Sequence, residues 1–177
     1  MSAPVVASTD ELTRDEVGQI RRLLDDAFGG AFSDDDWHHS IGGLHVFVRR
    51  DGEVISHGSV VARRLDAGAH RLSTGYVEAV ATRADARGRG NASRVLRRLA
   101  EQIQTDFDLG ALSADVPELY AALGWETWRG PTYVDAPGGR RRTAGDDGGV
   151  MVLRTTRTAT LDLDLDLTCD WRVGDVW

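Results

Sequence analysis

Six consecutive residues in the middle of the chain, Arg87-Gly88-Arg89-Gly90-Asn91-Ala92, have the composition of a phosphate-binding turn. Glycines allow several backbone N–H groups to converge on an anion at the start of a helix. The arginines would add charge-assisted hydrogen bonds to phosphate oxygens. The turn is neither a Walker A loop, because no Gly-Lys-Ser/Thr follows, nor a dinucleotide fingerprint, because Gly-x-Gly-x-x-Gly is missing. For the hexamer alone, an ordinary glycine-rich turn between a strand and a helix is the alternative interpretation.

A carboxylate, Glu78, lies on the predicted strand that leads into this turn. A carboxylate in that place could act as a general base on a nucleophile, either directly or through a water molecule. The alternative is a glutamate at the surface or at the edge of the core, with no part in chemistry.

Acidic side chains occur in several separate segments of the chain. The net charge is −7 and the pI about 5.2, so the protein repels nucleic acid phosphates and attracts cations. For any one acidic cluster a solvated surface is the simpler explanation, but together they favour a cleft that binds a cationic substrate. The aspartates concerned are Asp34, Asp35, Asp36, Asp146, Asp147 and Asp175.

The end of the chain offers a second set of polar and aromatic groups. Trp177 is terminal, so its indole and its α-carboxylate could both face a ligand. A chain end is usually frayed. Trp171, Asp175 and Trp177 predict that this one is anchored instead.

Metal and disulfide chemistry find no support in the sequence. Cys169 is the single cysteine, so no internal disulfide can form, and the five histidines are not spaced as a metal site. The alternating leucines and aspartates of 161–167 lack the glycine and the terminal Glu of a calcium loop. This alternation predicts instead a strand with leucines on one face and aspartates on the other.

Hydrophobic periodicity and capping signals predict a mixed α/β (α+β) fold, in which a mostly antiparallel sheet is flanked by helices. Thr13 and Glu16 form a capping-box pattern for the first helix, and Ser33 is a candidate cap for the second. Asp51-Gly52 predicts a hairpin, and residues 136–149 are expected to be a loop. Helices are expected at 13–28, after Ser33, at 91–106 with Val95, Leu96, Leu99 and Ile103 inward, and at 116–123. Strands are expected at 44–50, 53–63, 71–82, 109–113, 125–128, 150–154 and 160–170.

The length of 177 residues fits one domain covering 1–177. Charged residues near the N-terminus argue against a signal peptide, and no segment approaches the roughly 18 apolar residues of a membrane span. A cytoplasmic location is therefore expected, without membrane or nucleic acid partners.

The phosphate turn resembles the Arg/Gln-x-x-Gly-x-Gly/Ala signature of the GCN5-related N-acetyltransferase superfamily, which binds the pyrophosphate of coenzyme A. The downstream segment 119–125, Leu-Tyr-Ala-Ala-Leu-Gly-Trp, resembles the superfamily's Tyr…Gly-Phe segment, with Trp125 in place of Phe. The resemblance implies acetyl-CoA as co-substrate and direct acetyl transfer to an amine. It places the cofactor on the backbone of Val80, Ala81 and Thr82 and on the turn formed by Arg87, Gly88, Arg89, Gly90, Asn91 and Ala92.

Further segments resemble the aminoglycoside 2'-N-acetyltransferases of actinobacteria along nearly the whole chain. They are Asp36-Trp37, Gly42-Gly43-Leu44-His45, Gly75-Tyr76-Val77-Glu78, residues 109–113, Gly130-Pro131-Thr132 and, most specifically, the terminal residues 169–177. The resemblance implies an aminoglycoside substrate, antibiotic resistance and a homodimer. It implies that the antibiotic is contacted by Asp36, Glu78, Ser113, Asp147, Asp175 and Trp177.

Three catalytic roles follow from this resemblance. Glu78 would take the proton of the attacking amine. The amide of Val80 would polarise the acetyl carbonyl, and Tyr120 would protonate or hydrogen-bond the departing thiolate. Two alternatives stay open: an acetyltransferase for a cellular amine, such as a polyamine or a cell-envelope precursor, and a non-catalytic acyl-CoA-binding module.

Overall fold

The computed structural model describes residues 3–177, and its contacts divide the chain into two compact units. Unit 1 comprises the chain up to residue 61 together with 77–101, and unit 2 comprises 62–76 together with 102–177. Each unit is described by itself below. The single domain expected over 1–177 stays a prediction.

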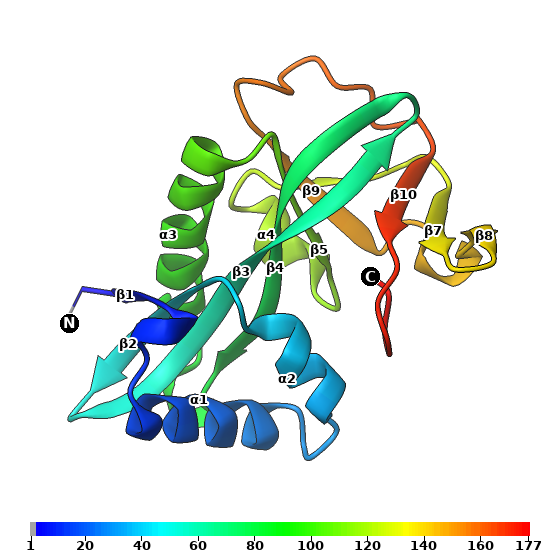
Figure 1. Cartoon of the computed structure of the whole chain (residues 1–177). Coiled ribbons are helices and arrows are strands. Elements are labelled where there is room, and N and C mark those ends of the chain that lie inside the picture. Colours follow the sequence, from blue (N-terminus) through cyan, green and yellow to red (C-terminus); the bar gives the residue numbers. More distant parts are fainter. Residues whose placement is uncertain (1–2) are drawn as a thin grey trace. The chain divides into compact units, whose positions relative to one another are not determined.

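Four α-helices and ten strands are found in the described part of the chain (Figure 1). The helices are α1 (Arg14–Ala27), α2 (Asp34–Ser40), α3 (Asn91–Asp106) and α4 (Pro117–Ala121), with short 3-10 turns η1 (Thr9–Glu11), η2 (Ala84–Ala86) and η3 (Ala144–Asp146). The strands are β1 (Val5–Ser8), β2 (Leu44–Arg50), β3 (Glu53–Ala67), β4 (His70–Thr82), β5 (Leu109–Ser113), β6 (Glu126–Thr127), β7 (Thr132–Ala136), β8 (Gly139–Arg142), β9 (Val150–Arg154) and β10 (Leu167–Asp170).

The predicted helix caps are confirmed. The Thr13 hydroxyl accepts a hydrogen bond from the Glu16 amide at 3.2 Å, and the Glu16 carboxylate accepts one from the Thr13 amide at 2.7 Å. Ser33 and Asp36 make the same reciprocal pair at the start of α2. These bonds satisfy N–H groups that have no partner within a helix, so both helices begin where the sequence predicts.

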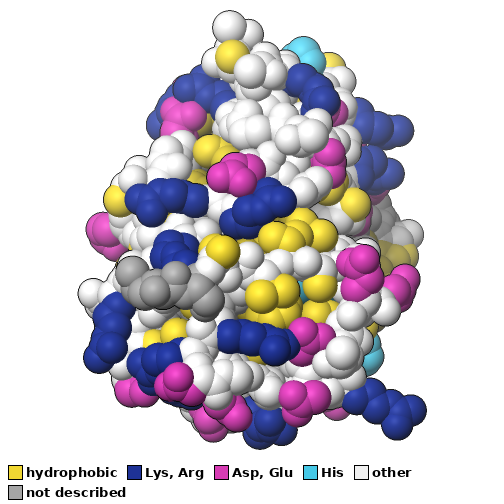
Figure 2. Space-filling view, turned by 90° about the vertical axis from the view of Figure 1, so that its left-hand side faces the viewer, with side chains coloured by type: hydrophobic (Ala, Val, Ile, Leu, Met, Phe, Trp, Pro, Cys, Tyr) yellow, Lys and Arg dark blue, Asp and Glu magenta, His cyan; other side chains and the backbone are white. Residues whose placement is uncertain are grey.

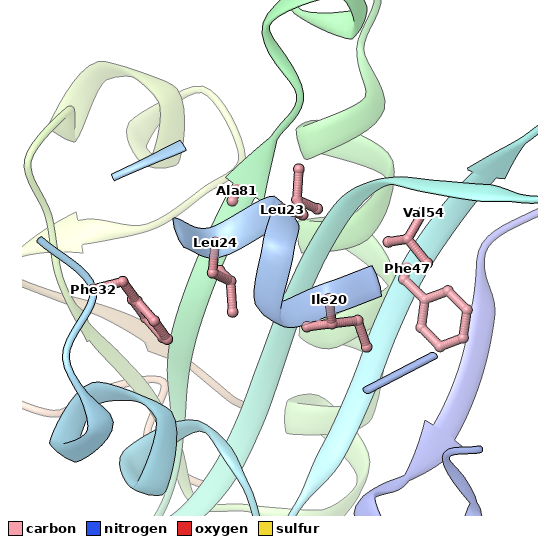
Figure 3. Packing of buried hydrophobic residues seen from close by; sticks show 7 residues of the cluster. All are labelled: Ile20, Leu23, Leu24, Phe32, Phe47, Val54 and Ala81. Carbon is pink, nitrogen blue, oxygen red and sulfur yellow. The ribbon is translucent and has the colours of Figure 1, made fainter. Parts of the chain in front are cut away.

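Unit 1 is built on the strand order β1–β2–β3–β4. Phe47 lies opposite His57 in the β2–β3 pair, and Val46 lies opposite Gly58, so these two pairs define the two faces of the sheet. The Phe47 face is covered by α1, whose Ile20, Leu23 and Leu24 pack with Phe47, Val54 and Ala81 (Figure 3). The Gly58 face is covered by α3, because Val95 and Leu99 methyl carbons lie 3.1 Å from where a Gly58 side chain would begin.

The hairpin between β2 and β3 forms as predicted. Asp51 and Gly52 have φ values of 53° and 86°, the left-handed backbone that a two-residue turn between twisted strands requires.

Unit 2 is built on the strand order β6–β9–β5–β4–β3–β10–β7–β8, in which β4 and β3 contribute residues 70–76 and 62–67. Thr74 pairs with Leu109 in a parallel ladder, and Leu167 pairs with Thr132 in another. The remaining assigned registers in this unit are antiparallel. The predicted fold class, a mixed and mostly antiparallel sheet with helices, is confirmed.

The strand predicted at 160–170 is wrong over its first part, since only Leu167–Asp170 form a strand. The Leu163 carbonyl accepts from the Arg129 and Gly130 amides at 3.0 Å, and the Leu165 carbonyl accepts from the Trp128 indole at 2.9 Å. These bonds draw the segment toward 128–130 and replace a strand ladder. The aspartates stay outside as predicted, and Asp164 pairs with Arg129 at 2.7 Å.

Several other element boundaries differ from expectation. Part of the loop predicted at 136–149 is β8, which pairs with β7 through Val134 and Arg141. The strand β1 carries too short an apolar pattern to be predicted, and it is held by pairing with β2. Two other elements differ in length: β3 is longer than predicted and α4 is shorter.

Surface charge in the described region is mixed. On the face drawn in Figure 2, basic and acidic side chains are interspersed, with hydrophobic atoms between them, and neither sign covers it continuously. None of the described helices combines the length and apolar composition needed to cross a membrane.

Candidate functional site

The turn 87–90 in unit 1 opens directly into α3. Gly88 and Gly90 have φ values of 70° and 74°, and a side chain starting from either would meet no atom within 4 Å. The first N–H groups of a helix have no acceptor within it. The turn is therefore an open cradle of backbone donors at the positive end of the α3 dipole, which suits a phosphate group.

Two side chains hold this cradle, one through β4 and the other through η2. The Arg87 guanidinium donates to the Thr82 carbonyl at 3.0 Å, and the Asn91 amide donates to the Ala86 carbonyl at 3.0 Å. Asn91 is buried, whereas Arg87, Gly88 and Arg89 are exposed. The structure thus brings the predicted cofactor residues of β4 and of the turn together, with the glycines facing open space.

The end of β4 has an irregular backbone where the catalytic residues are predicted. Ala79, between Glu78 and Val80, has a φ of 51°, a left-handed conformation that non-glycine residues rarely adopt. Val80 points toward the α3 face, with a methyl carbon 3.3 Å from the side-chain position of Gly58. Nothing about an alanine in an apolar strand signals such a conformation, so the sequence does not reveal it.

Side chains of β3 bind the carbonyl groups of this segment. The Ser56 hydroxyl donates to the Ala81 carbonyl at 3.2 Å, the His57 ring to the Ala79 carbonyl at 2.9 Å, and the Ser59 hydroxyl to the Glu78 carbonyl at 3.4 Å. Glu78 itself is half-buried. The backbone that would present a base and an oxyanion donor is therefore anchored from the neighbouring strand.

Tyr120 lies in unit 2, on α4. Tyr120 is 9% exposed, and its ring meets Trp125 edge to face, with ring centroids 6.2 Å apart. Burial, with a smaller contribution from the Asp115 carboxylate, raises the pKa of Tyr120 to about 12. The phenol therefore keeps its proton at neutral pH and is able to donate it.

Asp147 is the centre of a hydrogen-bond network in unit 2. Its Oδ1 accepts from the Thr132 amide at 3.0 Å, the Thr132 hydroxyl at 2.9 Å and the Arg142 guanidinium at 2.8 Å. Arg142 also pairs with Oδ2. The Arg142 hydrogen bond, and then the Thr132 bonds, hold the pKa of Asp147 well below its usual range. Much of this predicted substrate carboxylate is thus already engaged within the protein.

Asp146 and Asp175 form a like-charged pair in the same unit. Partial burial, followed by the negative charge of Asp175 and then of Asp147, raises the pKa of Asp146. Asp175 is exposed, and its Oδ1 accepts the Trp177 amide at 3.1 Å. A half-buried carboxylate and an exposed one that repel each other are a suitable receptor for a cation.

The C-terminal tail is anchored as predicted, but the Trp177 indole points inward. Trp177 is 3% exposed, and its indole N–H donates to the Thr143 hydroxyl at 2.9 Å. Arg172 donates to the Trp177 main-chain oxygen at 3.1 Å and to the Asp175 carbonyl at 2.6 Å. The tail's aromatic group therefore stabilises unit 2, and Arg172 holds the main-chain oxygens of Asp175 and Trp177. The sequence does not reveal this role of Arg172 among 21 arginines.

The two other predicted substrate residues have different surroundings. Asp36 belongs to unit 1, where its carboxylate caps α2 through the Ser33 amide and hydroxyl, both at 2.8 Å. Ser113 belongs to unit 2 and is exposed at the end of β5. Among the described residues, no group of His, Cys, Asp and Glu side chains has a geometry able to hold a metal ion.

A known protein family and a curated relative both match most of this chain. A family model for an acetyltransferase (GNAT) domain matches residues 8–128. The chain is 43% identical over 173 residues to a protein of Mycolicibacterium fortuitum named aminoglycoside 2'-N-acetyltransferase, covering 96% of this chain and 89% of that one.

Solved structures share the fold at low sequence identity. The chain is similar to the Escherichia coli GNAT family N-acetyltransferase YhbS, solved in complex with CoA, with a TM-score of 0.69 and 17% identity over 98% of this chain and 95% of that one. It is also similar to Escherichia coli ElaA, with a TM-score of 0.60 and 13% identity over 86% of this chain and 99% of that one.

Proposed function

This chain belongs to the GNAT acetyltransferase family, and from that premise we propose that it acetylates the 2'-amino group of aminoglycoside antibiotics. As a member of the family it is an acetyl-CoA-dependent N-acetyltransferase. The observation that carries the proposal is the 43% identity to the Mycolicibacterium fortuitum enzyme, which extends over 96% of the chain. Such a reaction would confer resistance to these antibiotics.

The residues of unit 1 fit acetyl-CoA. The open turn with Gly88 and Gly90 at positive φ would hold the pyrophosphate through backbone N–H groups, assisted by Arg87 and Arg89. The end of β4, from Val80 to Thr82, leads directly into this turn and would line the pantetheine arm. Acetyl-CoA supplies an activated acetyl group, so the protein needs no nucleophile of its own.

The protein's part in the reaction is to move protons and to stabilise charge. Glu78 would accept a proton from the substrate ammonium or amine, directly or through a water molecule. The Val80 amide would donate a hydrogen bond to the carbonyl oxygen as negative charge develops on it. Tyr120, kept protonated by its raised pKa, would donate to the departing sulfur.

Recognition of an aminoglycoside requires carboxylates for its ammonium groups. The Asp146–Asp175 pair in unit 2 supports this, since burial and then the negative charge of Asp175 raise the pKa of Asp146, and a bound cation would offset that negative charge. We also propose contributions from Asp36, Ser113, Asp147 and the carboxylate of Trp177, with the exposed Ser113 able to hydrogen-bond a sugar hydroxyl.

Kanamycin B and kanamycin A provide a sharp test, because they differ only in having an amine or a hydroxyl at the 2' position. We expect thiol release from acetyl-CoA with kanamycin B and none above background with kanamycin A. Equal rates with both would place the acetyl group elsewhere and contradict the 2' assignment. Activity on polyamines alone would indicate a cellular amine as the substrate.

Glu78→Gln tests the base with the same assay. General base catalysis typically contributes about 10²- to 10⁴-fold, so kcat is expected to fall and the pH–rate profile to lose its acidic limb, with acetyl-CoA affinity retained. A profile of unchanged shape and height would remove Glu78 from this role. A homodimer in the cytoplasm is part of the same proposal, and sedimentation of the purified protein tests the dimer.

A further inference from the structure

A continuous chain of hydrogen bonds crosses the interior of unit 1 and ends at the irregular segment of β4. The Thr9 hydroxyl lies 2.9 Å from His45 Nε2, and His45 Nδ1 lies 3.0 Å from His57 Nε2. His57 Nδ1 then lies 2.9 Å from the carbonyl oxygen of Ala79. Both imidazoles are completely buried, at 0% exposure. None of these side chains has a part in the mechanism described above.

The chemistry of the last acceptor fixes the tautomers of the two histidine rings when both are neutral. A carbonyl oxygen can only accept, so His57 Nδ1 carries a proton and its Nε2 accepts. His45 must then donate through Nδ1, which leaves its Nε2 as an acceptor for the Thr9 hydroxyl at 2.9 Å; the Gly43 carbonyl is a second, longer contact of that hydroxyl at 3.3 Å. The Gly42 amide, 2.8 Å away, donates to the same hydroxyl oxygen. All ring nitrogens are satisfied when both rings are neutral.

Burial agrees with this neutral state. Desolvation lowers the pKa of His45 to about 4, and desolvation together with the neighbouring His45 ring lowers the pKa of His57 to about 3. The rings therefore keep one fixed arrangement of donors and acceptors at neutral pH. A chain that ends on a carbonyl cannot pass a proton onward, so proton relay is excluded as its role.

The accepting carbonyl belongs to Ala79, the residue of β4 whose backbone conformation is unfavourable without stabilising contacts. Ala79 has a φ of 51°, which is unfavourable for any residue with a side chain and persists only where its surroundings impose it. Its neighbours on either side are Glu78 and Val80. A second donor from β3, the Ser59 hydroxyl, reaches the Glu78 carbonyl at 3.4 Å.

We propose that His57, held in its tautomer by His45, is a positioning residue that fixes the backbone of 78–80 for acetyl transfer through its hydrogen bond to the Ala79 carbonyl. The inference rests on the proposed function, in which Glu78 and the Val80 amide act on the reacting groups. His57 touches no substrate in this scheme. Its effect is to hold a conformation that the local sequence does not favour, so that the base and the oxyanion donor keep their directions.

Two substitutions at His57 separate this role from simple packing. His57→Leu fills much of the same space without a donor, whereas the amide nitrogen of His57→Asn can replace Nδ1 as a donor to the Ala79 carbonyl. Misplacing reacting groups by about 1 Å costs up to about a hundredfold. We therefore expect kcat to fall roughly ten- to hundredfold in His57→Leu and to recover most of that loss in His57→Asn, with the KM for the amine little changed.

Val46→Ala is the matched control. Val46 is also fully buried and neighbours His45 on β2, but it faces α3 on the other side of the sheet. It should lower the melting temperature and leave kcat unchanged. If His57→Leu and His57→Asn keep wild-type kcat, or lose it equally, the positioning role is refuted.

A measurement on the unsubstituted protein covers the case in which the His57 variants do not fold. With ¹⁵N-labelled histidine, NMR should show His57 and His45 neutral at pH 7 and protonated at Nδ1, the opposite of the form that predominates in free histidine. An Nε2-protonated His57 would overturn the inference, since no bond to Ala79 could then exist. Glu78→Gln is assayed in parallel: full activity there rejects the proposed base, while the Leu–Asn comparison at His57 still decides the positioning role by itself.

Discussion

Replacing Asp175 by Asn is expected to weaken aminoglycoside recognition and, at the same time, to stabilise the fold. The two effects share one cause, the repulsion between Asp175 and the half-buried Asp146, which after burial is the next largest contribution to the raised pKa of Asp146. A carboxylate with a raised pKa stabilises the folded state less as pH rises through that pKa, because ionisation is harder in the folded than in the unfolded chain. Asn keeps an Oδ1 that can accept the Trp177 amide, so the tail geometry is retained.

The expected gain in stability is small because Asp175 is exposed. Exposed charge pairs contribute about 0.2–1 kcal/mol, which corresponds to roughly 0.4–4 °C in melting temperature for a chain of this size. The gain should be present at pH 7. It should vanish as the pH falls below the raised pKa of Asp146, where protonation of that carboxyl removes the repulsion.

The expected loss in recognition is larger. A hydrogen bond to a charged group contributes about 1.5–3 kcal/mol, or roughly ten- to hundredfold in affinity. The exposure of Asp175 in the free protein places the effect near the lower end, so KM for tobramycin should rise about tenfold. The KM for acetyl-CoA should not change.

Asp162→Asn is a closely matched control for this substitution. Asp162 is also exposed, and its Oδ1 also accepts the amide two residues ahead, that of Asp164, at 3.0 Å. The change in net charge is the same in both variants. Steady-state kinetics with tobramycin and thermal melts at pH 7 compare them directly. If Asp175→Asn leaves KM for tobramycin within about twofold of the control, the Asp146–Asp175 pair is not the cation receptor and the reasoning fails.

Three further predictions follow from the site. Gly88→Ala and Gly88→Glu should both lose about 1 kcal/mol of stability, because each puts a side chain at a φ of 70°. Only the Glu variant should lose acetyl-CoA affinity, by about tenfold or more in titration calorimetry. Equal affinities of the two variants for acetyl-CoA would show that the phosphate does not bind at this turn. Tyr120→Phe should lower kcat by at least about tenfold at every pH below about 10, because the phenol stays protonated there, and full activity would remove it as a proton donor. Trp177→Phe should lower the unfolding free energy by about 1 kcal/mol, because the hydrogen bond to Thr143 is lost. Trp171→Phe, at a residue that is 44% exposed, should change the unfolding free energy by less than about half of that. Equal melting temperatures for the two variants would show that the Trp177 indole does not anchor the tail.

Local signals in the sequence were sufficient to predict several elements, among them those that carry the predicted cofactor residues. The capping box of Thr13 and Glu16, the Asp51-Gly52 hairpin and the apolar face of α3 are all decided by neighbours a few residues apart. The turn 87–90 belongs to the same class, because glycines at positive φ before a helix are a local device. For this reason the turn, the helix after it and the strand before it could be predicted together.

Tertiary contacts decided what local patterns could not. The alternation of leucine and aspartate in 161–166 is a strong strand pattern, but this segment does not form a strand. Its Leu163 and Leu165 carbonyls accept hydrogen bonds from residues 128–130, which are distant in sequence and which no local pattern identifies as partners. The sequence also suggested that the Trp177 indole could face a ligand, but it is buried and donates to Thr143, a residue distant in sequence.

The backbone of Ala79 shows most clearly the difference between what the sequence predicts and what the tertiary structure determines. The sequence identifies Glu78 and Val80 as candidates, but an alanine between them carries no sign of a left-handed conformation. That conformation is accompanied by hydrogen bonds from His57 and Ser59, about twenty residues earlier in the chain. Residue types and spacing therefore determined which groups are available for chemistry. Only the folded chain, where side chains distant in sequence compensate for a locally unfavourable backbone, decided how those groups are held.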